Sequence, residues 1–265
     1  MDQFIVILLY IFSGVLAGIS AGLLGAGGGT VVVPLLAIIF LHRGAPMTTA
    51  MHTAVGTSLA IMIITTIAST MAHAKRGSVC WDIFYRLLPG IAIGALLGAL
   101  VANALPGALL HKIFAVFLVL ASIQMAFQFI PTLRKGLRGW FSLSTFGLFS
   151  GAVASGLGIG GSIFNVPFLV MNRLSMRDAV GTTAVSGLPT ALVGAVVFLI
   201  AGWGLPNLPP NCIGFINIPA LCVVSIVTML TAGLGVRWAH KLEPEILRWV
   251  FSVFLLVIAI SMLIE

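Results

Sequence analysis

The sequence predicts an all-α integral membrane protein with about ten membrane segments, arranged as two inverted repeats of five. Of its 265 residues, 60% are hydrophobic and 7% are charged, a composition far outside the range of soluble domains. A glycine-rich sequence, GAGGGTVVVPLL from Gly25, returns as GIGGSIFNVPFL from Gly158. Irregular backbone is costly in lipid unless protein or water surrounds it. Two such breaks in matching halves therefore indicate one functional centre.

Ten apolar stretches account for the segments, and most approach the ~20 residues that a helix needs to cross a bilayer. The first has no positively charged start, so we expect a retained helix and not a cleaved signal peptide. The second and seventh are short, because ~12 to 14 residues span only about 20 Å of a core of roughly 30 Å. Both are predicted to begin inside the membrane, at the glycine-rich breaks. The stretches cover residues 4–24, 28–41, 53–73, 85–104, 109–130, 140–157, 161–172, 179–202, 214–236 and 246–264.

The distribution of Lys and Arg predicts the orientation. If all ten segments cross, one side holds eleven of the thirteen cations and the other keeps only Arg43 and Lys112, so the first side is cytoplasmic by the positive-inside rule. If the two short segments return to the side they entered from, the split becomes seven against six. We therefore expect ten crossings, with both termini outside the cytoplasm. The net charge of +7 then lies in short loops and forms no nucleic-acid-binding face.

Two further sequence pairs extend the repeat over almost the whole chain. AVGTSLA at residues 54–60 matches AVGTTAV at 179–185, and ANALPGALLHKIF from Ala102 parallels AHKLEPEILRWVF from Ala239. Each half holds five crossings, an odd number, so the halves enter the membrane from opposite sides. The expected organisation is a first membrane repeat (1–131), a cytoplasmic linker (132–139) and a second membrane repeat (140–265).

Inversion directs the N-termini of both short helices toward the middle of the protein. Free N–H groups and the positive ends of two helix dipoles would meet there, an arrangement that suits an anion. The candidate substrate-binding residues come from the breaks, from the helices that carry the AVGT sequences, and from polar side chains beside them. They are Gly27, Gly28, Gly29, Thr30, His52, Thr57, Ser58, Gly160, Gly161, Ser162, Asn165, Thr182 and Thr183.

Simpler interpretations stay open for these residues. The glycines could serve only close helix packing, which we predict for Gly90, Gly94 and Gly98 because they recur every fourth residue. The hydroxyls could bond their own helix backbone, and His52 could be an interfacial side chain.

Several kinds of functional residue are absent from the sequence, and their absence narrows the classes of function that it could have. All six acidic residues fall at termini, in loops or at span ends, which disfavours a proton relay or sodium site built on a carboxylate. No HExxH, GxSxG or cysteine-rich metal pattern appears. We expect no enzyme activity, no metal and no cofactor. The expected partners are a small anionic substrate and the lipid bilayer, with a homodimer left open and nucleic acid excluded.

The two GxGGG or GxGGS sequences that run into a proline, each followed by AVGT[ST], resemble the TauE/SafE sulfite exporter family. The resemblance implies a multi-pass carrier of the bacterial inner membrane for sulfur-containing anions such as sulfite, sulfoacetate or related sulfonates. Ser162 replaces the last glycine of the first copy, so the two half-sites are not expected to contact substrate identically. The matching motif residues are Gly27, Gly28, Gly29, Pro34, Gly56, Thr57, Ser58, Gly160, Gly161, Ser162, Pro167, Gly181, Thr182 and Thr183.

The leading hypothesis is alternating access around an anion bound near the midplane, between the two breaks. Export of one negative charge down an inside-negative potential gains about 2.3 kcal/mol per 100 mV, so it needs no coupling carboxylate. The alternatives are a proton-coupled importer of a small organic solute, for which His52 is the candidate proton site, an importer of a neutral or cationic solute, and a non-transporting membrane scaffold. An intramembrane enzyme is the weakest alternative.

Overall fold

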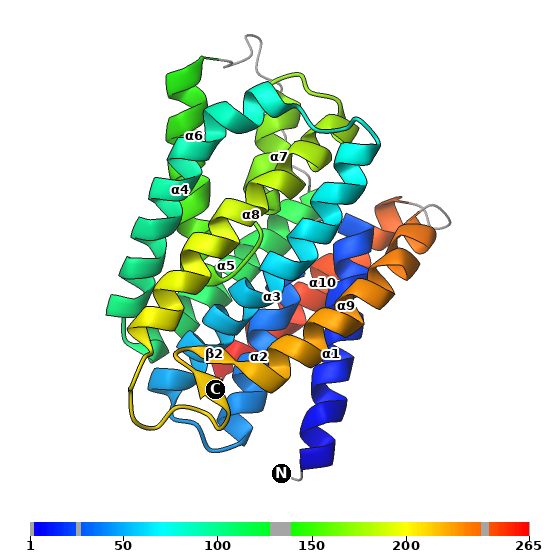
Figure 1. Cartoon of the computed structure of the whole chain (residues 1–265). Coiled ribbons are helices and arrows are strands. Elements are labelled where there is room, and N and C mark those ends of the chain that lie inside the picture. The colour runs from blue at the N-terminus through cyan, green and yellow to red at the C-terminus, as the bar shows by residue number, and fades with distance from the viewer. Residues whose placement is uncertain (1–2, 25–27, 128–138, 240–243, 265) are drawn as a thin grey trace.

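The computed structural model describes residues 3–24, 28–127, 139–239 and 244–264. Within them the chain forms ten helices and one two-stranded antiparallel hairpin (Figure 1). The elements are α1 (Gln3–Leu24), α2 (Gly29–His42), α3 (Met47–Lys75), α4 (Trp81–Ala104), α5 (Gly107–Phe127), α6 (Trp140–Leu157), α7 (Ser162–Met171), α8 (Met176–Ala201), β1 (Cys212–Ile213), β2 (Ile216–Asn217), α9 (Ile218–Ala239) and α10 (Pro244–Ile264). The predicted linker, residues 132–139, lies almost wholly outside the described residues.

The helices make this a multi-pass membrane protein. Six of those described, α1, α3, α4, α5, α6 and α8, are long and apolar enough to cross a membrane. Shorter apolar stretches lie in α2, α7, α9 and α10. The two stretches that the sequence predicted to be short are the helices α2 and α7, of 14 and 10 residues.

Several helices begin before the apolar stretch that predicted them. α3 starts at Met47 behind Pro46, and α8 starts at Met176, where the Ser175 hydroxyl accepts the N–H of Asp178 at 3.1 Å. Hydropathy marks only the apolar part of a helix, whereas caps and prolines fix where it starts. As a result Gly56 lies well inside α3, and not at its beginning as expected. The hairpin was not predicted.

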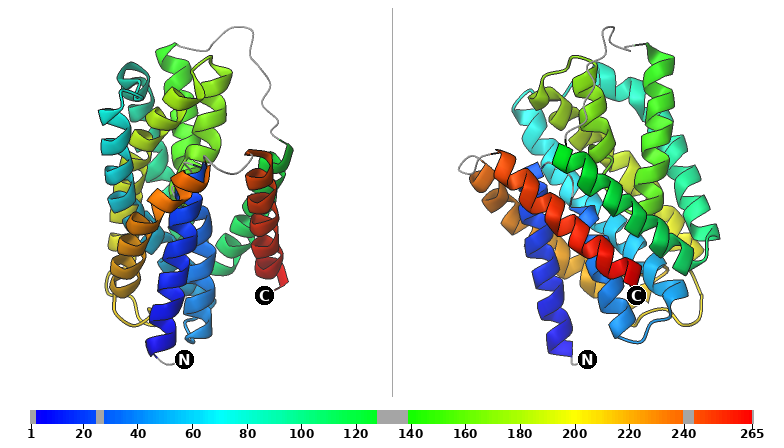
Figure 2. Two further views of the ribbon diagram at one scale, coloured as in Figure 1. Left: turned by 90° about the vertical axis from the view of Figure 1, so that its right-hand side faces the viewer. Right: turned by 180° about the vertical axis from the view of Figure 1, so that it is seen from behind.

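Helices that the predicted repeat pairs with each other pack in matching ways. α3 packs against α8 and α5 packs against α10, so each of these helices meets its own counterpart. α4 packs along α6, and α9, the counterpart of α4, packs along α1, the counterpart of α6. Figure 1 shows α3 and α8 running through the middle of the molecule, and Figure 2 shows α5 and α10 side by side on one flank.

The connections gather at two opposite ends. The α2–α3 corner and the β1–β2 hairpin lie at the end that also holds the N-terminus, whereas the α3–α4 and α7–α8 corners lie at the other end (Figure 1). Both chain ends point toward the hairpin end (Figure 2). The connecting loops therefore lie at the two ends of the long axis, as expected for a membrane protein that meets water on both sides.

Small residues allow the closest helix contact. A Cβ at Gly90, Gly94 or Gly98 of α4 would clash with backbone carbonyls of α6, which confirms the predicted packing role of this every-fourth-residue series.

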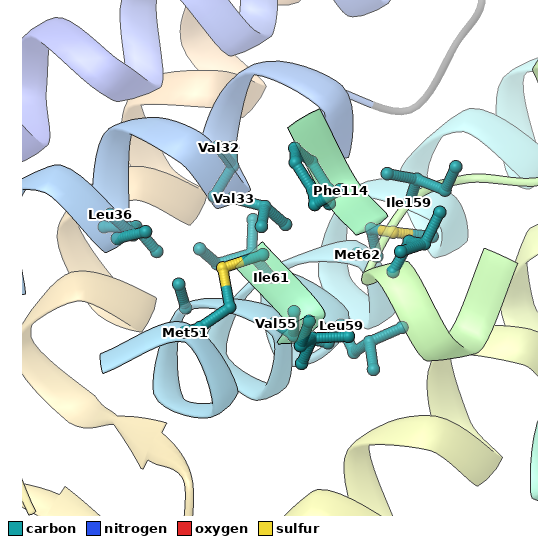
Figure 3. Packing of buried hydrophobic residues seen from close by; sticks show 14 of the residues in the cluster. Val32, Val33, Leu36, Met51, Val55, Leu59, Ile61, Met62, Phe114 and Ile159 are labelled. Atoms are coloured by element: carbon teal, nitrogen blue, oxygen red, sulfur yellow. The ribbon is translucent and has the colours of Figure 1, made fainter. Parts of the chain in front are cut away.

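The main core joins the two halves. It combines side chains of α2, α3 and α5 with Ile159, which follows α6 in the second half. Figure 3 shows Ile159 close to Met62 of α3 within this cluster. The second glycine-rich break is thus anchored in the first half of the chain.

Candidate functional site

The second glycine-rich break is a sharp interruption between α6 and α7. Gly158 ends α6 with φ +69°, a left-handed conformation that glycine adopts without strain. A Cβ there would lie 3.0 Å from Cα of Val55 on α3, so the backbone of the break sits directly on the central helix. Gly161 then precedes α7, and its carbonyl accepts the N–H groups of Phe164 and Asn165.

The first break is described from Gly28 onward, and Gly27 lies outside the described residues. Gly28 has φ +68° and precedes α2. Its carbonyl accepts the N–H groups of Val31 and Val32 at 3.0 Å. Gly29 and Thr30, which open the helix, are buried. Each short helix therefore starts from a buried glycine turn.

The two breaks touch each other. A Cβ at Gly29 would lie 2.6 Å from the carbonyl oxygen of Gly158 and 3.0 Å from Cα of Ile159. The hydroxyl of Ser58, on α3, donates to the same Gly158 carbonyl at 2.8 Å. Three segments far apart in sequence thus meet at one point, and Gly29, Ser58 and Gly158 define what we call the central junction.

Seven buried polar side chains have an atom with no hydrogen-bond partner among the described residues, and three of these side chains lie on α6, α7 and α8. Their unpartnered groups are the Ser155 hydroxyl, the Oδ1 atom of Asn165 and the Thr183 hydroxyl. Each such group costs about 1–3 kcal/mol if nothing satisfies it. Ser162, by contrast, donates to the carbonyl of buried Gly160, at 3.4 Å. The unsatisfied groups are all able to bind a polar guest.

The first AVGT sequence holds the hairpin end of α9. The hydroxyl of Thr57 accepts the backbone N–H of Asn217 at 2.9 Å, and a Cβ at Gly56 would clash with the carbonyl oxygen of Phe215. We call Gly56, Thr57, Phe215 and Asn217 the α9 socket. Thr57 is fully buried, and its lone pair serves the start of a helix.

The second AVGT sequence does the same for α4. The hydroxyl of Thr182 accepts the backbone N–H of Cys80 at 3.0 Å, and a Cβ at Gly181 would clash with the carbonyl oxygen of Ser78. These four residues form the α4 socket. Asn217 lies as many positions after Cys80 as Ala239 lies after Ala102, where the last pair of repeated sequences begins. The two sockets therefore occupy equivalent places in the predicted repeat.

Sequence reasoning missed Asn217. Its Oδ1 accepts the N–H of Ala220 at 3.0 Å and its Nδ2 donates to the carbonyl of Pro210 at 2.9 Å, so it caps α9 and fixes the loop before it. An asparagine just before a helix with proline in its first turn is an N-cap signature, and this signal was present in the sequence. Beside it, burial raises the pKa of the Cys212 thiol.

His52 lines a cavity at the hairpin end. Its side chain is 4% exposed, and its ring stacks on that of Phe215 with centroids 5.2 Å apart. Nδ1 lies 2.7 Å from the carbonyl oxygen of Thr48, and Nε2 lies 3.1 Å from that of Ala102 on α4. The cavity, here called the His52 cavity, has a volume of about 300 Å³.

A second cavity opens at the opposite end. It has a volume of about 270 Å³ and lies between the starts of α4, α6 and α8. Arg86, Arg173 and Ser175 line it together with two aspartates. Within the part of the chain that the structure describes, no three His, Cys, Asp or Glu side chains gather into a metal site.

Comparisons with known proteins agree with this architecture. A family model described as "Sulfite exporter TauE/SafE" matches residues 10–262. A probable membrane transporter protein of Haemophilus influenzae is 34% identical over 99% of this chain and 100% of its own length. One of Methanocaldococcus jannaschii is 29% identical over 99% of this chain and 97% of its own, and YdhB of Bacillus subtilis is 28% identical over 88% and 90%. No solved structure matches the chain.

Proposed function

The chain belongs to the sulfite exporter TauE/SafE family and is a membrane transporter, and from this premise we propose that it exports small sulfur-containing anions such as sulfite, sulfoacetate or sulfonates. The anion binds near the midplane, at the central junction of Gly29, Ser58 and Gly158. The two halves then rock to expose it to one side or the other. The membrane is the bacterial inner membrane.

One observation carries the proposal: the two glycine turns meet, and unsatisfied buried polar groups lie on the helices beside them. The hydroxyls of Ser155 and Thr183 can each donate a hydrogen bond to the anion, whereas the unsatisfied Oδ1 atom of Asn165 can only accept one. Hydrogen-bond donors in a buried site can replace the hydration shell of an anion, so the site needs no positively charged side chain. All six acidic side chains fall at termini, in loops or at span ends, so none lies near the midplane to repel it.

The inverted repeat gives the proposed mechanism its symmetry. The packing of α4 on α6 and of α9 on α1, together with the two matching sockets, supports a two-fold relation between the halves. Cavities at opposite ends of the molecule support alternating access through its middle. The distribution of cations supports a cytoplasmic location for the end that holds Arg86 and Arg173, which puts both termini outside.

Flux through purified protein in liposomes tests the proposal. We expect a labelled sulfonate to cross the membrane, and an imposed potential, negative on the side it leaves, to accelerate its exit. A flux that ignores voltage but follows a pH gradient would overturn simple export of an anion and favour a proton-coupled importer.

Two variants separate transport from scaffolding. Gly29→Ala adds a methyl group at the central junction, where it must displace backbone, whereas Gly233→Ala on α9 meets nothing within 4 Å. We expect Gly29→Ala to lose flux at least tenfold while both variants remain folded. If Gly29→Ala transports like Gly233→Ala, the central junction is not the site. If the wild-type protein moves none of the anions, the proposed substrate class is wrong.

A further inference from the structure

The α7–α8 corner has an arginine where the α2–α3 corner, its counterpart in the first half, has a glycine. α2 and α7 end in the same way: the residue two positions past the helix is left-handed. Its N–H and the next N–H bond to carbonyls three and five positions back. This residue is Gly44, with φ +84°, in the first half and Arg173, with φ +66°, in the second. Glycine is the usual residue at this place in the motif.

The left-handed conformation is unfavourable for arginine. It brings Cβ too close to the following carbonyl oxygen, a contact that glycine avoids. Residues held in such conformations cluster at binding sites, where the position of the side chain matters more than the local cost. Arg173 lines the cavity of about 270 Å³ at this corner, which we call the Arg173 cavity.

The charged lining of the Arg173 cavity suits an anion. Two guanidinium groups, those of Arg86 and Arg173, line it. Its two carboxylates already have partners, since Asp82 pairs with Arg86 at 2.8 Å and Asp178 accepts the hydroxyl of Ser175 at 2.8 Å. A guanidinium carries five N–H donors in a planar fork, so Arg86 can bind Asp82 and an anion together. The fork matches a group with two or more anionic oxygens.

The apolar lining suits a carbon chain. Ile83 of α4, Leu143 of α6 and Leu174 of the corner complete the wall. Ser144, beside Leu143, donates to the carbonyl of Arg86 at 2.7 Å, which fixes α6 against α4 at the cavity. A short carbon chain gains free energy on apolar walls, whereas an inorganic oxyanion does not. The volume lies below the ~300–1,000 Å³ of sites for drug-sized ligands, so the fitting ligand has only a few carbon atoms.

The His52 cavity at the other end has the opposite chemistry. None of the described residues that line it is lysine or arginine. The Oδ1 atom of Asn103, one of its lining residues, has no hydrogen-bond partner among the described residues. This atom can only accept, and the Nδ2 of the same amide donates to the carbonyl of Ala99 at 2.8 Å. An acceptor repels an anion, so anion binding is expected at the Arg173 cavity and not at the His52 cavity.

We propose that the Arg173 cavity is the loading site of the transporter, where an organic sulfonate of a few carbon atoms binds before it passes to the central junction. Arg173 and Arg86 bind the sulfonate group, and Leu143 and Leu174 cover the carbon chain. The inference rests on the proposed function and deepens it, because it favours organic sulfonates over sulfite. Loading then takes place at the end that the cation distribution makes cytoplasmic. No coupled ion is needed, since the membrane potential still drives the anion outward.

Protection of Cys80 from a thiol reagent tests the site without any transport. Cys80 is half-buried and also lines the Arg173 cavity. The other two cysteines, Cys212 and Cys222, are replaced by alanine, and the protein is placed in nanodiscs of zwitterionic lipid. The rate of labelling by uncharged N-ethylmaleimide is measured against the concentration of ethanesulfonate at constant ionic strength. We expect saturating ethanesulfonate to slow the labelling at least fivefold.

Substitutions of Arg173 separate binding from structure. Arg173→Gln should raise the half-protecting concentration at least tenfold. Arg177→Gln is the matched control, because Arg177 is an exposed arginine of the same corner whose loss changes the net charge equally. Arg173→Gly should weaken protection as Arg173→Gln does, while its unfolding temperature does not fall, since glycine accepts the left-handed conformation. A merely structural arginine would lose stability in both variants.

Chain length tests the preference for organic anions. Methanesulfonate, ethanesulfonate and propanesulfonate carry the same charge and differ only in their carbon chains. The half-protecting concentration should fall by up to about fourfold for each added methylene group. Equal values for the three anions would overturn the preference.

Other outcomes would overturn the loading site itself. Equal weakening by Arg173→Gln and Arg177→Gln would mean that only general surface charge attracts the anion. Protection that Thr183→Val abolishes and Arg173→Gln keeps would mean that the anion acts from the middle of the protein. Protection by anionic lipid alone, in nanodiscs without sulfonate, would make the cavity a site for lipid phosphate.

The two proposals fail in different ways. Flux of a sulfonate without protection of Cys80 leaves the proposed export intact and overturns the loading site. If Cys80 is protected as expected but no anion crosses in liposomes, the cavity binds sulfonate, and the proposed export fails together with the loading role.

Discussion

The equivalent sequences on α3 and α8 share two residues in role and differ in the third. Gly56 with Thr57, and Gly181 with Thr182, each form a socket for the start of a helix from the other half. The next residue breaks the symmetry. Ser58 donates to the carbonyl of Gly158, whereas Thr183 has no partner among the described residues.

This difference separates architecture from function. A contact that appears twice, at equivalent places in both halves, is needed by the fold in each half. A buried polar group without a hydrogen-bond partner is costly, and Thr183 is such a group whereas its equivalent Ser58 is not. We therefore assign the Gly-Thr pairs to holding the two halves together, and we propose that Thr183 contacts the substrate.

Substitution of the socket glycines should give the largest effect. In Gly181→Ala the new methyl group clashes with the backbone of Ser78, which cannot rotate away as a side chain could. We expect a loss of ~1–3 kcal/mol of stability, measured as a drop in thermal unfolding temperature in detergent. Gly56→Ala should behave alike, and Gly233→Ala is the control. A Gly181→Ala protein as stable as Gly233→Ala would show that the α4 socket is not tight.

Substitutions of the third residue, Ser58 or Thr183, should separate effects on stability from effects on transport. Ser58→Ala leaves the buried carbonyl of Gly158 without this donor and should cost about 1–3 kcal/mol. Thr183→Val removes a hydroxyl that has no described partner, so its unfolding temperature should stay the same or rise while flux falls at least tenfold. Thermal shift and liposome flux on both variants check this. Equal losses of stability in the two would remove the contrast between the halves.

The socket threonines should have matching, smaller effects. Thr57→Val and Thr182→Val each remove one acceptor from a helix-start N–H, worth about 1 kcal/mol. The sockets are far apart in the fold, so the double variant should lose the sum of the two single changes. Chemical or thermal unfolding of all three proteins measures it. A marked departure from additivity would mean that the sockets are coupled.

Substitution of Arg177 should have the smallest effect on stability. It is exposed, and its guanidinium donates to the carbonyl of Arg76 at 2.7 Å. Exposed contacts of this kind contribute little, so Arg177→Gln should change stability by no more than about 0.5 kcal/mol. His52 and Arg177 each stand two residues before a repeated AVGT sequence, but His52 is buried, so His52→Gln should be the more destabilising of the two in the same thermal assay.

The sequence predicted the helices well and their ends less well. Apolar stretches and glycine-rich breaks gave the short helices α2 and α7, and the family resemblance was confirmed by the match over residues 10–262. The start of α3 at Met47 and the β1–β2 hairpin were missed, because polar first turns and short loops carry no hydropathy signal. The predicted site residues remain a prediction, with Gly27 outside the described part of the chain.

What the sequence determined by itself is what depends on neighbours along the chain. A run of apolar residues must be helical in lipid, and a glycine cluster must interrupt it, whatever surrounds them. Only the tertiary structure decided which polar groups are satisfied. Ser58 bonds Gly158, 100 positions away, and His52 bonds Ala102, 50 positions away. Such bonds depend on which helices pack together, and that choice is made by the shapes of whole helix faces, which no local pattern records.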